Sequence, residues 1–268
     1  MGKAYEDVDF LHSRDARTLR ILAEYLEPQA RFAHYSVTDT VVFFGSSRAL
    51  PPDEALAATA AARAQGDARR IEIAERIAAL SRYYEDARTL ARLLTEWSKG
   101  LRQPSRRFLV CSGGGPGIME AANRGASEAA GISVGLGISL PMEATANRYI
   151  TRELGFEFHY FFMRKFWFVY LAKALVVFPG GFGTLDELFE LLTLTQTRKI
   201  GKRMPVVLYG RAFWDEVVDF DALVRWGTIA PEDLGLFQVC DSPGEAFGYL
   251  ESELTRLYLE PASGPGTE

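Results

Sequence analysis

Three short stretches of the chain are rich in glycine, and each follows an apolar run. They are GSS at 45–47, GGGPG at 113–117 and PGGFGT at 179–184. Glycine permits positive φ angles and lets backbone N–H groups approach a ligand without a Cβ in the way. A helix that begins directly after such a loop adds unpaired donors and a partial positive charge. One such loop is as easily a tight turn, but three at one sheet edge favour an anionic ligand such as a phosphate.

Two common nucleotide motifs do not fit these loops. The dinucleotide fingerprint would need a third glycine at position 118, where Ile118 stands. The Walker loop would need Ser or Thr after a Gly-Lys pair, and neither Gly2-Lys3 nor Gly201-Lys202 is followed by one. The sequence therefore predicts phosphate binding without hydride transfer or nucleoside triphosphate hydrolysis.

Two carboxylates, Asp186 and Glu187, follow the third loop. We expect both in the first turn of the next helix, where the helix dipole favours negative charge, and this is a sufficient structural explanation for Asp186. Glu187 lies three residues after Thr184, which is the spacing of a capping box if Thr184 is the N-cap. Capping alone does not require the glycines beside it, so Glu187 is also a candidate for chemistry.

A basic pair, Arg164-Lys165, lies among aromatic residues in FFMRKFWF. Basic pairs are usually solvated, but these aromatic neighbours make a fully wet position less favourable. The pair follows an apolar segment, so its cations could face the same sheet edge as the glycine loops.

Six apolar runs predict the strands that position these residues. The expected strands are 40–47, 107–115, 132–141, 155–162, 174–181 and 205–210. Helical patterns stand at 118–130, 184–196 and 212–224, and a further helix is expected from Met163. Alternating short strands and helices are typical of an α/β fold with a doubly wound parallel sheet (Rossmann-like), in which ligands bind beyond the carboxyl ends of the strands.

Two helical segments lie outside this alternation. Residues 14–35 place Leu19, Leu22 and Leu26 on one face, and residues 67–100 repeat apolar positions along one long helix. We interpret both stripes as core or oligomer packing. The expected organisation is an N-terminal helical extension over 1–38, a Rossmann-like nucleotide-binding catalytic domain over 39–257 and a disordered tail over 258–268.

The composition narrows the class of protein. The chain has 268 residues, of which 48% are hydrophobic, and a formal charge of −5, which argues against a general nucleic-acid coat. Cys111 and Cys240 are far apart and indicate neither a disulfide framework nor a cysteine metal site, so a reducing compartment is favoured. The N-terminus resembles no signal peptide, and no apolar run is long enough for a membrane span. We expect a cytoplasmic protein with no nucleic-acid or membrane partner and no metal site.

The motifs resemble those of the LONELY GUY (LOG) family. PGGFGTLDE at 179–187 is similar to the family signature PGGxGTxxE, and Arg164-Lys165 is similar to the basic pair that precedes it there. The stretches at 45–47 and 113–119 resemble the two earlier loops of the family, and the resemblance covers roughly residues 40–226. Members are often labelled lysine decarboxylase-like. Characterised ones are cytokinin riboside 5′-monophosphate phosphoribohydrolases, which split N6-modified AMP, and often AMP, into free base and ribose 5-phosphate.

The resemblance implies roles for individual residues. Arg164 and Glu187 would be the catalytic pair, with Gly181, Gly183 and Thr184 around the phosphate. Further substrate contacts would come from Gly45, Ser46, Gly114, Gly115, Lys165 and Gly180. Cleavage of C1′–N9 builds oxocarbenium charge on the ribose, which a carboxylate can stabilise while the phosphate anchors the sugar. This chemistry requires no metal or organic cofactor.

The chain departs from the short members of the family, and two other functions stay open. Phe161 stands where those members have a methionine, and the N-terminal helix and the longer 48–104 segment resemble the long subgroup. A non-catalytic nucleotide- or molybdenum-cofactor-binding protein of similar fold would use the same glycine loops. A pyridoxal-phosphate decarboxylase would need a Schiff-base lysine, for which Lys165 and Lys173 are available. The resemblance also implies a homodimer or homohexamer whose subunits complete one another's pockets.

Overall fold

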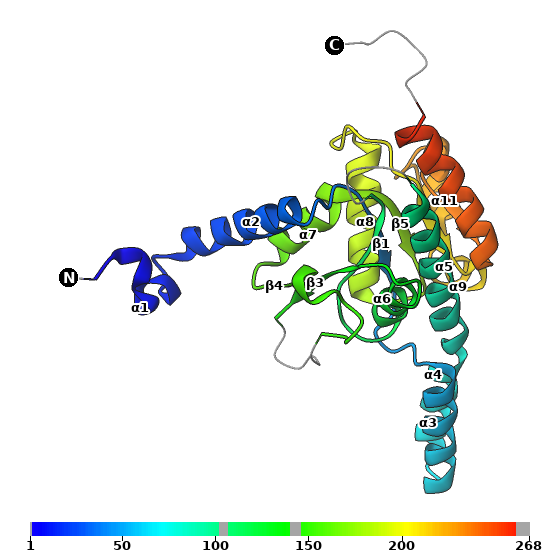
Figure 1. Ribbon diagram of the computed structural model, residues 1–268. Helices are drawn as coiled ribbons and strands as arrows, with labels where there is room; N and C mark the ends of the chain where they lie inside the picture. The colour runs from blue at the N-terminus through cyan, green and yellow to red at the C-terminus, as the bar shows by residue number, and fades with distance from the viewer. Residues whose placement is uncertain (1, 102–106, 140–145, 261–268) are drawn as a thin grey trace.

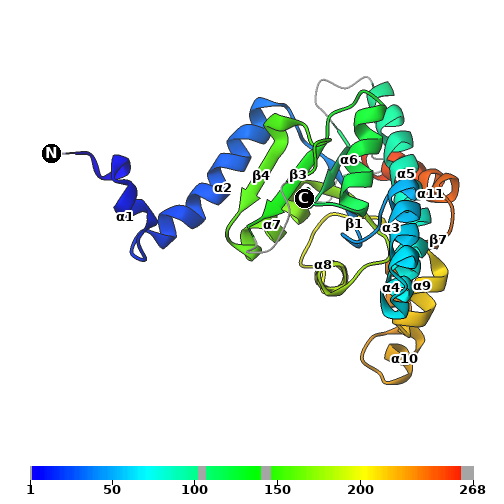
Figure 2. The same cartoon turned by 90° about the horizontal axis from the view of Figure 1, so that it is seen from below.

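The computed structural model describes residues 2–101, 107–139 and 146–260. Seven strands form one parallel sheet in the order β4-β3-β2-β1-β5-β6-β7, with helices on both faces (Figures 1 and 2). The strands are β1 Thr40–Phe44, β2 Leu109–Ser112, β3 Val134–Ile138, β4 Gly155–Phe158, β5 Ala172–Val177, β6 Val206–Tyr209 and β7 Gln238–Cys240. The doubly wound parallel sheet predicted from the sequence is therefore confirmed.

The predicted strands are shorter in the structure, and one strand was missed. The strand expected over 155–162 ends at Phe158, and the helix expected from Met163 begins at Phe161. The edge strand β7 has three residues, which is too short for a recognisable apolar period. The central strands β1, β2 and β6 are buried along their whole length because helices cover both faces of the sheet.

Two hydrophobic cores lie on opposite faces of the sheet. Side chains of β1 alternate between them: Val42 and Phe44 belong to one core, Val41 and Phe43 to the other. The first core is covered by α2 (Arg17–His34), α7 (Phe161–Leu171), α8 (Phe182–Gln196) and α9 (Arg211–Val217). The second is covered by α5 (Ser81–Gly100), α6 (Ile118–Glu128) and α11 (Pro243–Tyr258).

The remaining helices are short or project from this body. They are α1 (Val8–His12), α3 (Pro52–Gln65), α4 (Ala68–Ala79) and α10 (Phe220–Arg225), with 3-10 turns at Ala4–Glu6, Arg152–Leu154 and Pro231–Leu236. In Figure 1, α1 and the start of α2 form an arm on one side, and α3 and α4 form a hairpin that extends below the sheet. No helix of the described residues is both long and apolar enough to cross a membrane.

The single long helix predicted over 67–100 is wrong. The segment contains two helices, α4 and α5, which meet at Leu80, and α3 before them was not predicted. The apolar stripe divides accordingly. Leu90 and Leu94 of α5 are fully buried in the core, whereas Ile73 of α4 is 48% exposed.

The N-terminal helix predicted over 14–35 forms as α2. Its stripe of Leu19, Leu22 and Leu26, expected to pack in the core or in an oligomer, is 48–49% exposed, so it is not part of the core. The core side of α2 instead carries Phe32, which is buried, together with Ile21 and Tyr25. Of the tail expected to be disordered over 258–268, residues 261–268 lie outside the described residues. Its expected start is wrong, because Tyr258 is the last residue of α11 and packs against the core.

Candidate functional site

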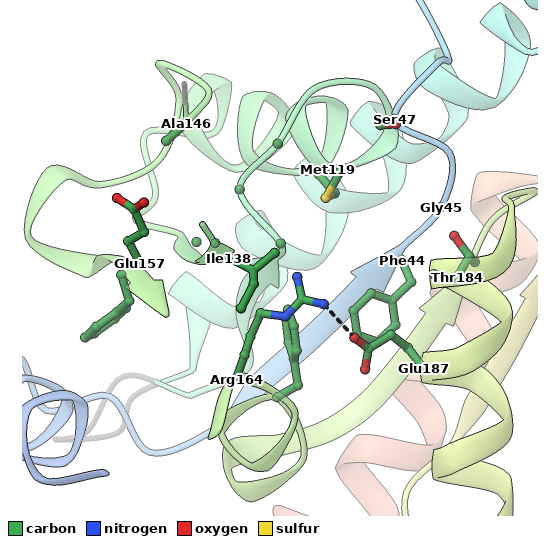
Figure 3. Close-up of a pocket in the computed structure, with 18 of the residues that line it drawn as sticks. Phe44, Gly45, Ser47, Met119, Ile138, Ala146, Glu157, Arg164, Thr184 and Glu187 are labelled. Atoms are coloured by element: carbon green, nitrogen blue, oxygen red, sulfur yellow. Dashed lines mark hydrogen bonds and ion pairs between the residues drawn. The ribbon is translucent and has the colours of Figure 1, made fainter. Parts of the chain in front are cut away.

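A cavity of about 1130 Å³ lies where β1, β2 and β5 end (Figure 3). The strand order reverses between β1 and β5, and such switch points are where open α/β sheets bind ligands. Residues of all three glycine loops line the cavity, together with Arg164 from α7 and Glu187 from α8. The predicted site residues among its lining are Gly45, Ser46, Gly114, Gly115, Arg164, Gly181, Gly183, Thr184 and Glu187.

Ser46 ties the three loops together through its backbone. Its N–H donates to the carbonyl oxygen of Pro179 at 2.9 Å, and its own carbonyl accepts from the N–H of Ile118 at 3.0 Å. Its hydroxyl accepts from the N–H of Arg48 at 3.1 Å. The amide of Ser46 is therefore occupied within the protein, and this residue holds the loops in register.

Two of the predicted site glycines have a packing reason within the protein. A Cβ on Gly45 would lie 2.8 Å from the side chain of Ile118, and one on Gly180 would lie 2.1 Å from Oγ1 of Thr184. Gly180 is also not among the residues that line the cavity. Both glycines are explained by the close approach of a helix to a loop, α6 to the first loop at Gly45 and α8 to the third loop at Gly180.

Gly181 and Gly183 have no such reason. A Cβ on either would meet no atom within 4 Å, and both residues line the cavity. Glycine in a helix is less stable than alanine, so Gly183 weakens the start of α8 without any gain in packing. Open space above these two backbones is what the close approach of a ligand requires.

The start of α8 differs from the expectation and changes the interpretation of its acids. The helix begins at Phe182 with Gly181 as N-cap, and no side chain caps it. Neither Asp186 nor Glu187 is in the first turn, so their predicted position is wrong. Thr184 lies inside the helix and is not the N-cap, which excludes the capping-box explanation of Glu187. The first-turn N–H groups of α8 have no side-chain cap, and the residues that begin the helix, Phe182, Gly183 and Thr184, line the cavity.

A chain of amide and hydroxyl groups fixes the second glycine loop. The side-chain amide of Asn147 donates to the carbonyl oxygens of Gly114 and Gly115, both at 3.1 Å, and to Oδ1 of Asn123 at 3.0 Å. Asn123 is fully buried and accepts from the hydroxyl of Ser112, which in turn accepts from the N–H of Gly114 at 3.0 Å. The carbonyl groups of Gly114 and Gly115 are thus held in place by Asn147.

Arg164 and Glu187 face each other across the cavity wall (Figure 3). Nη2 of Arg164 donates to Oε1 of Glu187 at 3.1 Å, and the side chains are only 16% and 8% exposed. The guanidinium lies 5.3 Å from the ring centroid of Phe161 and 5.5 Å from that of Phe168. Its Nε is buried and has no acceptor among the described residues. Arg164 therefore keeps donor capacity beyond its bond to Glu187.

Burial raises the pKa of Glu187 to about 7, well above the ordinary value of 4.5. The positive charges of Arg164 and Lys165 oppose this rise, and the negative charges of Glu190 and Asp186 add to it. A carboxyl group with a pKa close to neutral can exchange a proton at physiological pH, which suits acid–base chemistry.

Lys165 lies outside the cavity lining. Its ammonium pairs with Asp186 at 2.7 Å and with Glu190 at 2.9 Å. Burial acts to lower the pKa of Lys165, but the hydrogen bonds to the two carboxylates raise it above its usual range. Lys173 also does not line the cavity, and it pairs with Asp39 at 3.5 Å.

Several lining residues were not predicted from the sequence. Arg48 follows the first loop, Phe182 is 93% exposed beside the third, and Glu157 of β4 lies across the cavity from Glu187 (Figure 3). Phe182 is the variable position within PGGFGT and could have been found from its place in that motif. Arg48 and Glu157 carry no local signal, because only the order of the strands brings them to this cavity. The described residues contain no group of three or more His, Cys, Asp or Glu side chains placed to hold a metal ion.

Comparisons with known proteins give one family-model match and several similar solved structures. Residues 119–250 match the family model described as "Possible lysine decarboxylase". No curated protein matches the chain. Among solved structures the chain is similar to TM1055, a structural genomics target, with 20% identity over 80% of this chain and 99% of that one, at a TM-score of 0.48. It is also similar to the Moco carrier protein of Chlamydomonas reinhardtii, with 18% identity over 82% and 99% of the chains and a TM-score of 0.48.

Proposed function

We propose that the protein is a nucleoside 5′-monophosphate phosphoribohydrolase, because its motifs resemble those of the LOG family and residues 119–250 match the family model described as "Possible lysine decarboxylase". It hydrolyses the N-glycosidic bond of AMP or N6-modified AMP to the free base and ribose 5-phosphate. The observation that carries this proposal is the buried Arg164–Glu187 pair beside the uncapped start of α8. One cavity thus offers an anion site and, next to it, a carboxyl group with a pKa of about 7.

The phosphate binds at the glycine loops. First-turn N–H groups of α8 donate to it, and the space above Gly181 and Gly183 lets its oxygens reach the backbone. The side chain of Asn147 keeps the carbonyls of Gly114 and Gly115 turned toward itself. This removes two negative dipole ends from the neighbourhood of the anion.

Glu187 acts on the sugar. Its helix also provides the phosphate donors, so the anchored phosphate fixes the ribose relative to this carboxyl group. As a carboxylate, Glu187 stabilises the positive charge that develops on the ribose and orients the attacking water. Arg164 holds Glu187 in place, and its free N–H groups can stabilise negative charge on the departing base.

The literal meaning of the family description finds little support in the placement of the lysines. A decarboxylase that forms a Schiff base needs a lysine in the cavity. Lys165 and Lys173, the two candidates from the sequence, do not line it, and each pairs with carboxylates elsewhere.

We further propose that the protein acts as a homodimer or homohexamer in the cytoplasm. Exposed apolar side chains lie on α7, the helix that carries Arg164, and on the neighbouring α2. They are the outer aromatic residues of α7 and Leu19, Leu22 and Leu26 of α2. A second subunit that covers them would approach the mouth of the cavity.

The test is incubation of the protein with a panel of nucleoside monophosphates and their nucleosides, followed by chromatography of the released bases. We expect cleavage of AMP or an N6-substituted AMP, and much slower cleavage of the matching nucleoside. Equal rates for AMP and adenosine would contradict the phosphate anchor. Tight AMP binding without release of adenine would support the non-catalytic nucleotide-binding alternative.

A further inference from the structure

We propose that Glu24, on the N-terminal helix α2, is a positioning residue that supplies the missing N-terminal cap of α7 and thereby sets the place of Arg164. The inference rests on the proposed function of Arg164. It gives a role to a helix that lies outside the family match at 119–250.

The carboxylate of Glu24 bonds to the backbone where α7 begins. Oε1 accepts from the N–H of His159 at 2.8 Å, and Oε2 accepts from the N–H of Tyr160 at 3.2 Å. Tyr160 is the N-cap of α7 and provides no side-chain cap of its own. An acid that accepts from the N-cap N–H is half of a capping box, and here it comes from another helix.

Two features make this contact suitable for positioning. The negative charge of Glu24 lies at the positive end of the α7 dipole, and this attraction stabilises the contact between Glu24 and the start of α7. β4 ends at Phe158, so the amides of His159 and Tyr160 have passed beyond the sheet ladder. Glu24 satisfies both amides and so fixes the turn between β4 and α7.

Arg164 is bonded directly to the capped residue Tyr160. The backbone N–H of Arg164 donates to the carbonyl oxygen of Tyr160 at 3.2 Å, a hydrogen bond of the first turn of α7. Phe161, in the same turn, lies against the guanidinium of Arg164. A shift at Tyr160 therefore moves both the backbone of Arg164 and the ring that supports its side chain.

The rest of α2 packs along α7 and makes the connection rigid. The indole N–H of Trp167 donates to the carbonyl oxygen of Glu24 at 3.0 Å. The ring of Tyr25 lies 5.5 Å from that of Phe166, and the ring of Phe32 lies 5.4 Å from that of Trp167. Figure 1 shows α2 lying next to α7 at one edge of the molecule. No residue of α2 lines the cavity. The helix reaches the cavity wall through α7 and also through Arg31, whose Nη1 donates to the carbonyl oxygen of Gly155 in β4 at 2.9 Å.

The first experiment compares steady-state kinetics of Glu24→Ala, Glu24→Gln and the control Glu27→Ala in the full-length chain. Glu27 is three residues along the same helix, and within the described part of the chain its carboxylate pairs with Arg31 of the same helix. For Glu24→Ala we expect kcat to fall roughly tenfold, because small displacements of a reacting group cost rate rather than binding. KM should change less than about twofold, since no residue of α2 lines the cavity. Glu24→Gln keeps one acceptor oxygen and should recover part of kcat, and Glu27→Ala should behave as wild type.

A double-mutant cycle with Arg164→Ala separates positioning from a general loss of stability. If Glu24 acts through Arg164, Glu24→Ala should reduce kcat no further once Arg164 is absent. An equal fractional loss in both backgrounds would overturn the proposal. So would a loss in Glu24→Ala that appears in KM alone.

Hydrogen exchange provides a readout that does not depend on catalysis. The amides of His159 and Tyr160 should exchange faster in Glu24→Ala than in Glu27→Ala, measured well below the melting temperature of both. Unchanged exchange at these amides would refute the cap even if activity fell. If the wild type released no base from any nucleotide, the proposed function would fail, and the exchange result alone would still decide whether Glu24 holds α7.

Discussion

The pair formed by Arg164 and Glu187 combines two properties that rarely serve stability. Its carboxyl group is 8% exposed and has a pKa of about 7, so its charged form is disfavoured despite the neighbouring guanidinium. Its guanidinium keeps a buried Nε without a protein acceptor. Residues with such costs are characteristic of sites that act on a ligand.

Replacement of Glu187 by glutamine should remove turnover and preserve nucleotide binding. The side chain keeps its size but loses the negative charge that faces the developing oxocarbenium, so we expect a fall of about 10²–10³ in rate. Affinity for AMP should persist because the backbone of α8 supplies the phosphate donors. Single-turnover hydrolysis and calorimetric AMP binding test this. Asp186→Asn, a neighbouring exposed acid, serves as the matched control and should keep its activity.

The pH profile of kcat should reflect the raised pKa of Glu187. If the carboxylate is the working form, kcat rises with pH up to about 7 and is level above it. The positive charge of Lys165 lowers the pKa of Glu187, so Lys165→Gln should shift the rising part of the kcat profile to higher pH. Rates at saturating nucleotide between pH 5 and 9 provide the measurement. A profile unaffected by Lys165→Gln would contradict the assignment of the rising part to Glu187.

The ionisation of Glu187 should also affect the free energy of unfolding, which should fall with rising pH while kcat increases. The folded pKa of Glu187 exceeds the ordinary value of 4.5, so between these two values the folded state binds more protons than the unfolded state. Its contribution to stability is therefore present at low pH and is lost as pH rises through about 7. A shift of this size corresponds to about 3 kcal/mol. At pH 8 the melting temperature of Glu187→Gln should therefore exceed that of the wild type, and near pH 4 the two melting temperatures should be equal.

At the scale of elements, Gly183 makes the start of α8 less stable than alanine would, and it leaves open space above the backbone. Gly183→Ala should raise the melting temperature, because alanine favours the helix by up to about 1 kcal/mol and its Cβ meets no atom within 4 Å. The same methyl group should weaken AMP binding, because it would occupy the space where we propose that the phosphate binds. Thermal unfolding and calorimetry on one sample measure both effects.

Gly180→Ala is the contrasting variant in the same loop. Its Cβ would lie 2.1 Å from Oγ1 of Thr184, so this variant should lower the melting temperature. If Gly183→Ala bound AMP as tightly as wild type, the phosphate would have to bind elsewhere.

At the scale of the whole molecule, the exposed apolar side chains of α2 and α7 favour self-association. Leu22 is 48% exposed, and Phe162 and Tyr170 are each 51% exposed. Light scattering should give a dimer or a larger assembly, and Leu22→Asp should shift it toward the monomer. Leu56→Asp, the same change at a 72% exposed leucine of α3, should leave the assembly intact. A fully active wild-type monomer would contradict subunits that complete one another's pockets.

The sequence by itself determined the sheet, the three glycine loops and the charged residues near them. Apolar period and glycine position are local properties, so six strands and the strand-to-helix joints could be found without a structure. Parallel strands place their carboxyl ends at one edge, which is why loops far apart in the chain were expected to meet there.

Only the tertiary structure decided which surfaces of the elements are used. α2 has two apolar faces, and packing on α7 selected the one with Tyr25 and Phe32 over the leucine stripe. No glycine or proline marks the junction between α4 and α5 at Leu80, so the break was invisible to a pattern of apolar residues. The distinction between Gly180, which packing requires, and Gly183, which it does not, depends on atoms that neighbouring turns bring within reach. The bonds of Glu24 to α7 join residues more than 130 positions apart, and contacts at that distance follow from the folded topology rather than from any local period.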